Sequence, residues 1–118
     1  LGAAVDYLQA IGLPAIAAHE HALLDYATEQ FTRLPDVRII GTAQAKASVL
    51  SFIVNGYSVN DVAKHLDRHG IAARSGHHCA QPALRRFGVE ATVRASFGLY
   101  NSFADVDALV AALGRLVR

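Results

Sequence analysis

The chain has 118 residues, of which 53% are hydrophobic and 18% charged, and its formal net charge is +1. Its eleven lysines and arginines are scattered and form no basic stripe, which argues against nucleic-acid binding. No apolar run reaches the roughly 20 residues of a membrane span, and the length fits one domain or part of a larger one. About a quarter of residues are usually charged. The low charged share here reflects either an alanine-rich composition or, as we favour, apolar surface that packs against something outside this sequence.

The first third of the chain predicts two helices. Residues 1–12 are rich in helix formers and end at Gly12, a common helix stop. Pro14 begins a longer helix, whose buried stripe at helical spacing consists of Leu23, Leu24, Ala27, Phe31 and Leu34. The chain contains no methionine and starts inside a helical pattern, so we interpret it as a piece of a longer polypeptide.

The middle of the chain begins with two predicted strands. Residues 37–41 and 48–54 are β-branched or apolar runs, and a polar loop separates them. Ser58, followed three residues later by Asp61, then predicts the start of a helix that runs to His69. After this helix we expect a strand at 71–74 and a short helix at about 82–87.

The C-terminal part predicts one more strand and one more helix. Residues 92–97 alternate, so that one face carries Val93, Ala95 and Phe97 and the other carries Thr92, Arg94 and Ser96. Asn101 or Ser102 caps the last helix, whose apolar stripe consists of Val106, Leu109, Val110, Leu113, Leu116 and Val117. Together the elements predict an α+β fold, with a small, largely antiparallel sheet and helices packed on one face.

Cys79 is the only cysteine of the chain, and its surroundings are unusual. A solitary cysteine is by default a small buried hydrophobe. Here it follows Gly76, which allows a tight turn, and lies among histidines and an arginine, whose positive charge favours a thiolate. We therefore predict an exposed, reactive thiol. A single unpaired cysteine also fits a reducing cytoplasm.

Two motifs carry a resemblance to a known family. Residues 74–82 (RSGHHCAQP) resemble the active-site cysteine loop of SUF-type (group II) cysteine desulfurases, which are pyridoxal-phosphate enzymes of the class V aminotransferase family. Residues 93–97 (VRASF), with Tyr100 and Asn101, resemble their substrate-anchoring strand. The resemblance covers nearly the whole chain and implies that 1–118 is one domain, the C-terminal small domain of a fold-type I pyridoxal-phosphate enzyme. Residues 1–12 would then lead in from a large domain.

The resemblance implies a role for each residue of the two motifs. Cys79 would be the catalytic nucleophile that takes the sulfur of L-cysteine as a persulfide and leaves L-alanine, for iron–sulfur cluster assembly. This requires a thiolate at neutral pH, against a pKa of about 8.5 for free cysteine. Arg94 would bind the substrate carboxylate through two parallel hydrogen bonds, with Arg74 as a weaker candidate for the same pocket and Asn101 as a support for Arg94.

His77 and His78 have two possible interpretations. They could tune the thiol or transfer protons, or they could merely shape the loop. A metal site is not expected. His65 and His69 have the i, i+4 spacing of two zinc ligands, but no third ligand of suitable spacing accompanies them, which favours a solvated helix face.

The resemblance also implies a cofactor and partners outside this chain. Pyridoxal phosphate would be held by a lysine of the large domain, because Lys46 and Lys64, the two lysines here, do not lie in the expected sequence context. The chain alone should therefore be inactive. The implied partners are a sulfur-acceptor protein of the SUF system and a second copy in a homodimer, in the cytoplasm.

Several alternatives stay open. The motifs barely distinguish L-cysteine from L-selenocysteine or cysteine sulfinate, so a selenocysteine lyase or a cysteine-sulfinate desulfinase is possible. A stand-alone, non-catalytic thiol carrier belongs to a different class. A class V aminotransferase without desulfurase activity is disfavoured, because Cys79 occupies the thiol position.

Overall fold

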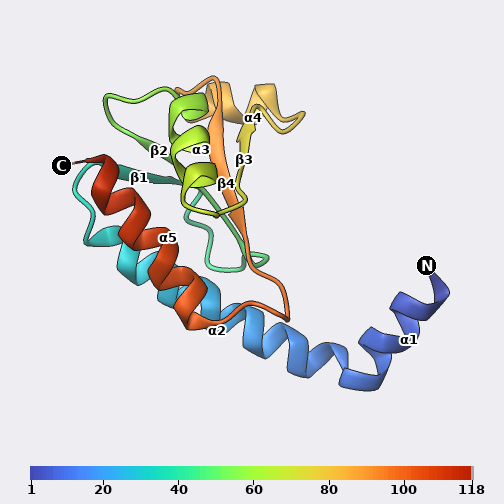
Figure 1. Ribbon diagram of the computed structural model, residues 1–118. Coiled ribbons are helices and arrows are strands. Elements are labelled where there is room, and N and C mark those ends of the chain that lie inside the picture. The colour runs from blue at the N-terminus through green and yellow to red at the C-terminus, as the bar shows by residue number, and fades with distance from the viewer. Residues whose placement is uncertain (118) are drawn as a thin grey trace.

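The computed structural model describes residues 1–117, which form five helices and four strands (Figure 1). In chain order the elements are α1 (Gly2–Ile11), α2 (Leu13–Thr32), β1 (Val37–Ile40), β2 (Val49–Val54), α3 (Val59–Arg68), β3 (Arg74–Gly76), α4 (Gln81–Arg86), β4 (Thr92–Ser96) and α5 (Phe103–Leu116). The strands form one sheet in the order β1-β2-β4-β3, and every neighbouring pair is antiparallel. The predicted α+β fold is confirmed.

The third strand begins later than predicted. Residues 71–73 are irregular, and pairing with β4 starts at Arg74. The backbone N–H of Ile71 donates to Leu66 O at 3.0 Å and closes the end of α3, while Ile71 and Ala73 pack partly buried against the core. The apolar character of 71–73 therefore reflects packing of a connection and not strand pairing.

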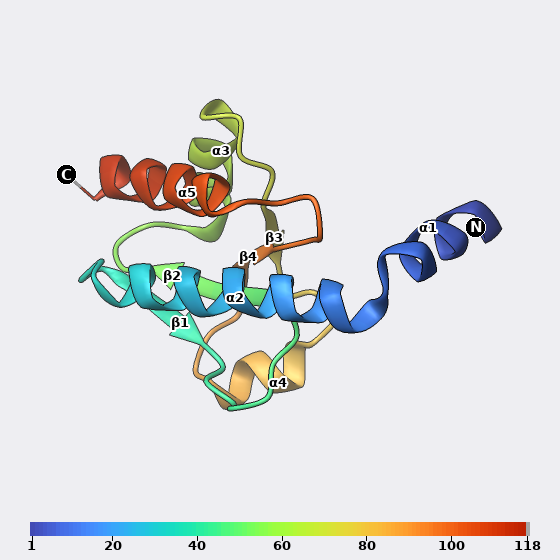
Figure 2. The ribbon, with the colours of Figure 1, turned by 90° about the horizontal axis from the view of Figure 1, so that it is seen from below.

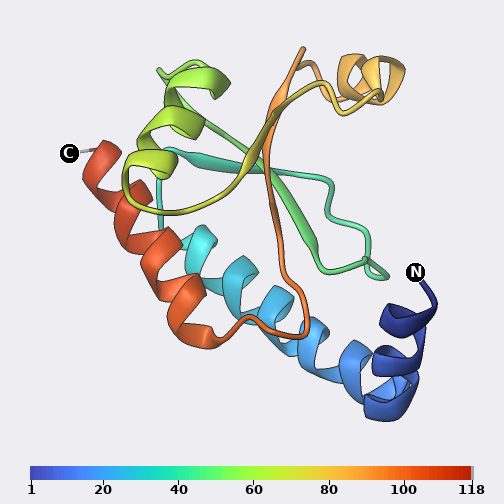
Figure 3. The same cartoon turned by 45° about the vertical axis from the view of Figure 1, so that its right-hand side comes forward.

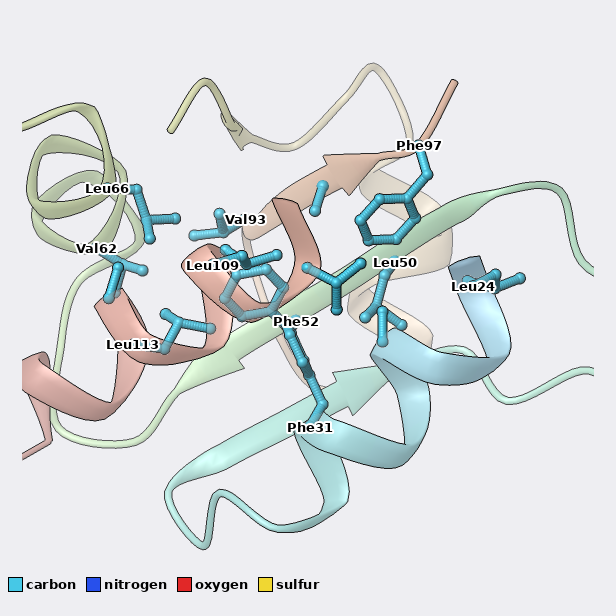
Figure 4. Packing of buried hydrophobic residues seen from close by; sticks show 14 of the residues in the cluster. Leu24, Phe31, Leu50, Phe52, Val62, Leu66, Val93, Phe97, Leu109 and Leu113 are labelled. Carbon is cyan, nitrogen blue, oxygen red and sulfur yellow. The ribbon is translucent and has the colours of Figure 1, made fainter. Parts of the chain in front are cut away.

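One face of the sheet carries the hydrophobic core. The strand register places Leu50 and Phe52 of β2 beside Ala95 and Val93 of β4. Helices α2, α3 and α5 cover this face (Figures 1 and 3), and their apolar side chains meet those of the strands (Figure 4). Phe31 of α2 packs edge-on against Phe52, with ring centroids 5.0 Å apart. The apolar side chains that the sequence pattern places on this face are thus buried by other residues of the same chain.

The opposite face of the sheet is polar along β4. Arg94 lies directly across from Ser51 of β2 on one side and from Arg74 of β3 on the other. Helix α4 lies on this side of the sheet (Figure 3), where its residue Leu84 is buried and the Arg38 guanidinium of β1 donates to Phe87 O at 3.1 Å. Arg74 from the first sequence motif and Arg94 from the second therefore lie side by side on this face.

Side-chain caps define the starts of two helices. Ser58 accepts a hydrogen bond from the backbone N–H of Asp61 at the start of α3, as predicted. Ser102, and not Asn101, caps α5, in a capping box with Asp105. Backbone and side-chain hydrogen bonds from residues 101–102 lower the pKa of Asp105 below its ordinary value, which is the expected result of stabilising the carboxylate.

Helix α1 projects from the rest of the chain (Figures 1 and 2). None of its residues is buried, and its apolar side chains Val5, Tyr7 and Ile11 are exposed. These exposed side chains agree with the expectation from composition that part of the apolar surface is not covered within the described residues. No helix in the described part of the chain has both the length and the hydropathy to cross a membrane.

Candidate active site

The loop between β3 and α4 presents Cys79 at the surface. The thiol is free and exposed, as predicted. His78 and Cys79 both have left-handed backbone angles, with φ of 53° and 57°, a conformation that costs of order 1 kcal/mol or more for each non-glycine residue. The Cys79 N–H donates to His77 Nδ1 at 3.0 Å, and the Ala80 N–H donates to His77 O at 2.9 Å. His77 therefore supports the strained turn around the thiol.

Gly76 directs the chain from β3 into this loop. Its φ is +133°, a value that residues with a side chain rarely adopt. A Cβ built at this position would meet no atom within 4 Å. The glycine is therefore required by the backbone conformation and not by lack of space.

The His78 imidazole is tied to strand β4. Its Nε2 lies 3.2 Å from Thr92 O and 3.1 Å from Thr92 Oγ1. Because a carbonyl oxygen only accepts, Nε2 carries the hydrogen. The other ring nitrogen, Nδ1, is buried and has no partner among residues 1–117.

The surroundings of His78 disfavour its charged form. Burial is the main cause that lowers its pKa below the ordinary value of 6.5, and the positive charges of Arg94, Arg74 and His77 lower it further. The hydrogen bond to Thr92 opposes this shift in part. His78 is thus neutral at neutral pH, with an unprotonated Nδ1.

Arg94 is a half-buried cation that forms no ion pair with an acid among residues 1–117. Its Nε is buried and makes no hydrogen bond to the described residues. The ion pair found within residues 1–117 joins Glu29 of α2 to Arg33, which caps that helix, and does not involve Arg94. Arg74 lies directly opposite Arg94 in the sheet, and like charges in such positions repel each other. An anion bound between the two guanidinium groups would relieve both problems.

A cavity of about 310 Å³ joins the loop to Arg94. Its lining includes Arg94 and Thr92 of β4, Ser51 of β2 and the apolar side of α4. His78 and Ala80 contribute to the lining, whereas Cys79 between them does not. The thiol therefore lies next to the cavity along the chain but not on its wall.

Asn101 lies in the turn after β4, away from the cavity that Arg94 lines. Its Oδ1 accepts from the Gly98 N–H at 2.8 Å, and its carbonyl accepts from His19 Nε2 at 2.8 Å. It borders a separate cavity of about 360 Å³ near Tyr100 and α5, and no hydrogen bond joins it to Arg94 among residues 1–117. The structure gives Asn101 a part in holding the turn after β4, and its role toward substrate stays a prediction.

Thr92 belongs to the site although the sequence analysis did not single it out. Only 1% of its surface is exposed, although it lies on the polar face of β4. The cysteine loop and α4 cover it there. The sequence feature that could have identified Thr92 is its position two residues before Arg94, which places both side chains on the same face of the strand.

The described residues do not fit covalent attachment of pyridoxal phosphate. The Lys46 ammonium donates to Gly41 O at 3.1 Å in the connection between β1 and β2, and Lys64 is exposed on α3, on the other side of the sheet. Neither lines the cavity beside Cys79.

His65 of α3 and His69, which caps the C-terminus of that helix, are engaged with the backbone. His65 Nε2 donates to Ala112 O and His69 Nδ1 donates to His65 O, each at 2.8 Å. Within residues 1–117 no group of three or more histidine, cysteine or acidic side chains could hold a metal ion.

Comparison with known proteins first defines the class of protein. The family model described as aminotransferase class-V matches residues 1–109. The chain therefore belongs to this pyridoxal-phosphate-dependent family, as the two motifs indicated.

Two curated relatives are described as cysteine desulfurases. The chain is 56% identical over 113 residues to a probable cysteine desulfurase of Mycolicibacterium paratuberculosis, covering 96% of this chain and 16% of the relative. It is 53% identical over 116 residues to the cysteine desulfurase of Synechococcus elongatus, covering 98% and 18%. The chain thus spans less than a third of the length of these curated relatives.

Solved structures agree with the fold. The apo cysteine desulfurase of Thermococcus onnurineus matches with a TM-score of 0.91 and 41% identity, over 96% of this chain and 28% of that one. The cysteine desulfurase CsdA of Escherichia coli, in an S-sulfonic acid form, matches with a TM-score of 0.89 and 35% identity, over 98% and 28%. The chain has the fold of one part of these enzymes.

Proposed function

We propose that this chain is the C-terminal small domain of a SUF-type cysteine desulfurase. It would contribute a sulfur-accepting thiol, Cys79, and a carboxylate-binding guanidinium, Arg94, to an active site that other parts of the protein complete. The observation that carries the proposal is the half-buried Arg94, whose Nε has no partner within residues 1–117 and which lines the cavity beside the cysteine loop. The similarity to cysteine desulfurases over nearly the whole chain supports the same reading.

Arg94 is suited to bind the carboxylate of an amino acid. A planar guanidinium forms two parallel hydrogen bonds with a carboxylate, and partial burial strengthens them because water screens the charges less. Arg74, directly across from Arg94 and more exposed, adds positive potential on the same face. The site would thus hold the substrate by its carboxylate end, and Asn101 would act on it only through the turn after β4.

Cys79 is the proposed acceptor of sulfur. Its thiolate would attack the sulfur of bound L-cysteine, so that a new S–S bond forms, the C–S bond breaks, and L-alanine leaves after its Cβ takes up a proton. The enzyme keeps the sulfur as a persulfide. The position of Cys79 on an exposed turn supports a second step, transfer of this sulfur to an acceptor protein for iron–sulfur cluster assembly.

The cofactor would be bound by another part of the protein. Pyridoxal phosphate supplies an electron sink that weakens bonds around the α-carbon of an amino acid, and the two lysines of this chain do not reach the cavity. We propose that the chain alone is inactive, and that the complete enzyme is a cytoplasmic homodimer that works with a sulfur acceptor of the SUF system.

Mass spectrometry of the full-length protein tests this function. After brief exposure to L-cysteine, the peptide that contains Cys79 should carry one extra sulfur atom, and L-alanine should appear. The same assay with L-selenocysteine and cysteine sulfinate ranks the possible substrates. Sulfur bound to Cys79 without release of L-alanine would instead favour a thiol carrier, and no sulfur on Cys79 would contradict the proposal.

A further inference from the structure

We propose that Thr92 is a positioning residue for the cysteine loop, and that it acts by holding the His78 imidazole against β4. It does not touch the reacting atoms in this arrangement but sets where the loop places them. The inference rests on the proposed function for its kinetic consequence, whereas its structural part concerns the loop alone.

The contact between His78 and Thr92 is the link that ties the loop to the strand. Both the hydroxyl and the carbonyl of Thr92 lie within 3.2 Å of His78 Nε2. Among the hydrogen bonds of the described residues, no other one joins residues 77–80 to β4. Thr92 is itself fully buried under the loop, so water does not compete for this hydrogen bond.

The backbone of the loop needs such a restraint. His78 and Cys79 occupy consecutive left-handed conformations, which residues with a Cβ avoid unless their surroundings enforce them. The hydrogen bonds to His77 lie within the loop and do not tie it to the sheet. The bond to Thr92 instead anchors the strained turn to the sheet, two residues from Arg94 on the same face.

The backbone at Thr92 also determines which His78 nitrogen carries the proton. Its carbonyl accepts from Nε2–H and leaves Nδ1 unprotonated beside the cavity. The charged or titratable neighbours are Arg94 from β4, Arg74 from β3 and His77 from the loop. The cavity-lining residues of β1, β2 and α4 are uncharged. No acid within residues 1–117 lines this cavity to stabilise a second proton.

The proposal separates the two halves of the site. Arg94 lies in the middle of a paired strand and does not depend on the loop for its position. Release of the loop should therefore displace Cys79 while carboxylate binding persists. Thr92→Val keeps the backbone carbonyl and removes the hydroxyl, one of the two contacts to His78 Nε2. In the full-length enzyme this should lower kcat for L-cysteine about fivefold, the effect of one hydrogen bond of about 1 kcal/mol, and leave KM within about twofold.

Hydrogen–deuterium exchange of the full-length protein tests the structural part. The Cys79 and Ala80 amides, both hydrogen-bonded within the loop, should be protected in the wild type. They should exchange about fivefold faster in Thr92→Val. Thr92→Ser keeps the hydroxyl and should restore wild-type exchange and kcat. Thr28→Val, which removes a hydroxyl bonded within α2 to Leu24 O, is the matched control and should change neither.

A double-mutant cycle distinguishes positioning from general loss of stability. If Thr92 acts through His78, then Thr92→Val should have no further effect on exchange in a His78→Asn background. Equal effects in both backgrounds, or unprotected loop amides in the wild type, would overturn the inference, and the wild-type measurement decides even where Thr92→Val fails to fold. Loop coupling without persulfide on Cys79 would instead uphold the positioning and refute the proposed function.

Discussion

The two faces of β4 differ sharply although they alternate residue by residue. Val93 and Ala95 are buried among apolar side chains of three helices. Thr92 and Arg94, on the other face, line a cavity, and the Arg94 guanidinium has a buried nitrogen without a partner in the described chain. The core face is packed within these residues, whereas the other face carries a buried polar atom that no described residue pairs with. Stability should therefore depend on one face and chemistry on the other.

The largest effect on chemistry should come from the thiol. Cys79→Ser in the full-length protein should abolish persulfide formation, because a serine hydroxyl is a much weaker nucleophile than a thiolate. The side chain is exposed, so the free energy of unfolding should change by less than about 0.5 kcal/mol. Persulfide-specific labelling and urea unfolding measure the two quantities. Normal sulfur release from L-cysteine by the serine variant would remove Cys79 from the mechanism.

The largest effect on stability should come from the core face. Phe52→Ala removes a fully buried ring that packs edge-on against Phe31, and this should cost about 3–5 kcal/mol of unfolding free energy. Phe103→Ala is the matched control, because its ring is about half exposed and should cost far less. Denaturant unfolding followed by circular dichroism measures the difference. Equal losses for the two variants would contradict the dependence of stability on the core face.

Arg94→Ala should have the opposite pattern to Phe52→Ala, with a loss of activity and no loss of stability. Loss of a desolvated partner for the substrate carboxylate should lower kcat/KM for L-cysteine, at a cost of about 2–4 kcal/mol in transition-state stabilisation. The free energy of unfolding should stay the same or rise, because repulsion from Arg74 is relieved. Arg68→Ala, at an exposed position on α3, is the control and should leave kcat/KM unchanged. Steady-state kinetics and thermal unfolding decide. A loss of stability without a loss of kcat/KM would show that Arg94 is structural.

The smallest effect should be a pH dependence from His78. Burial and the neighbouring positive charges lower its pKa in the folded protein below the ordinary value of 6.5. The unfolded chain therefore binds more protons in the window just below pH 6.5, and the folded state loses stability as the pH falls through it. His78→Asn should flatten this part of the profile, as measured by urea unfolding at pH 7.5 and 5.5. A profile that His78→Asn leaves unchanged would contradict the neutral, buried imidazole.

Much of the fold follows from local patterns in the sequence. The alternation at 92–97 and the apolar stripe of the last helix predicted β4 and α5 because each pattern has the period of its element. The strand expected at 71–74 was misplaced, since apolar residues in a connection resemble a strand when only their composition is considered.

The candidate site was predictable only where a motif was present. The exposure of Cys79 followed from its glycine-containing, cationic neighbourhood. The burial of Thr92 did not follow, because it results from a loop that folds back over the strand from 14 residues away along the chain. The sequence also left the cap of α5 open between Asn101 and Ser102. In the structure, hydrogen bonds to Gly98 and His19 engage Asn101, and Ser102 caps the helix.

A crystal structure of the full-length protein with a bound L-amino acid tests the central claim most directly. The account predicts that the carboxylate forms two hydrogen bonds with the Arg94 guanidinium, on the polar face of β4, with the Cys79 sulfur turned toward the bound molecule. An acidic side chain from elsewhere in the protein paired with Arg94, with the amino acid bound at another place, would contradict it.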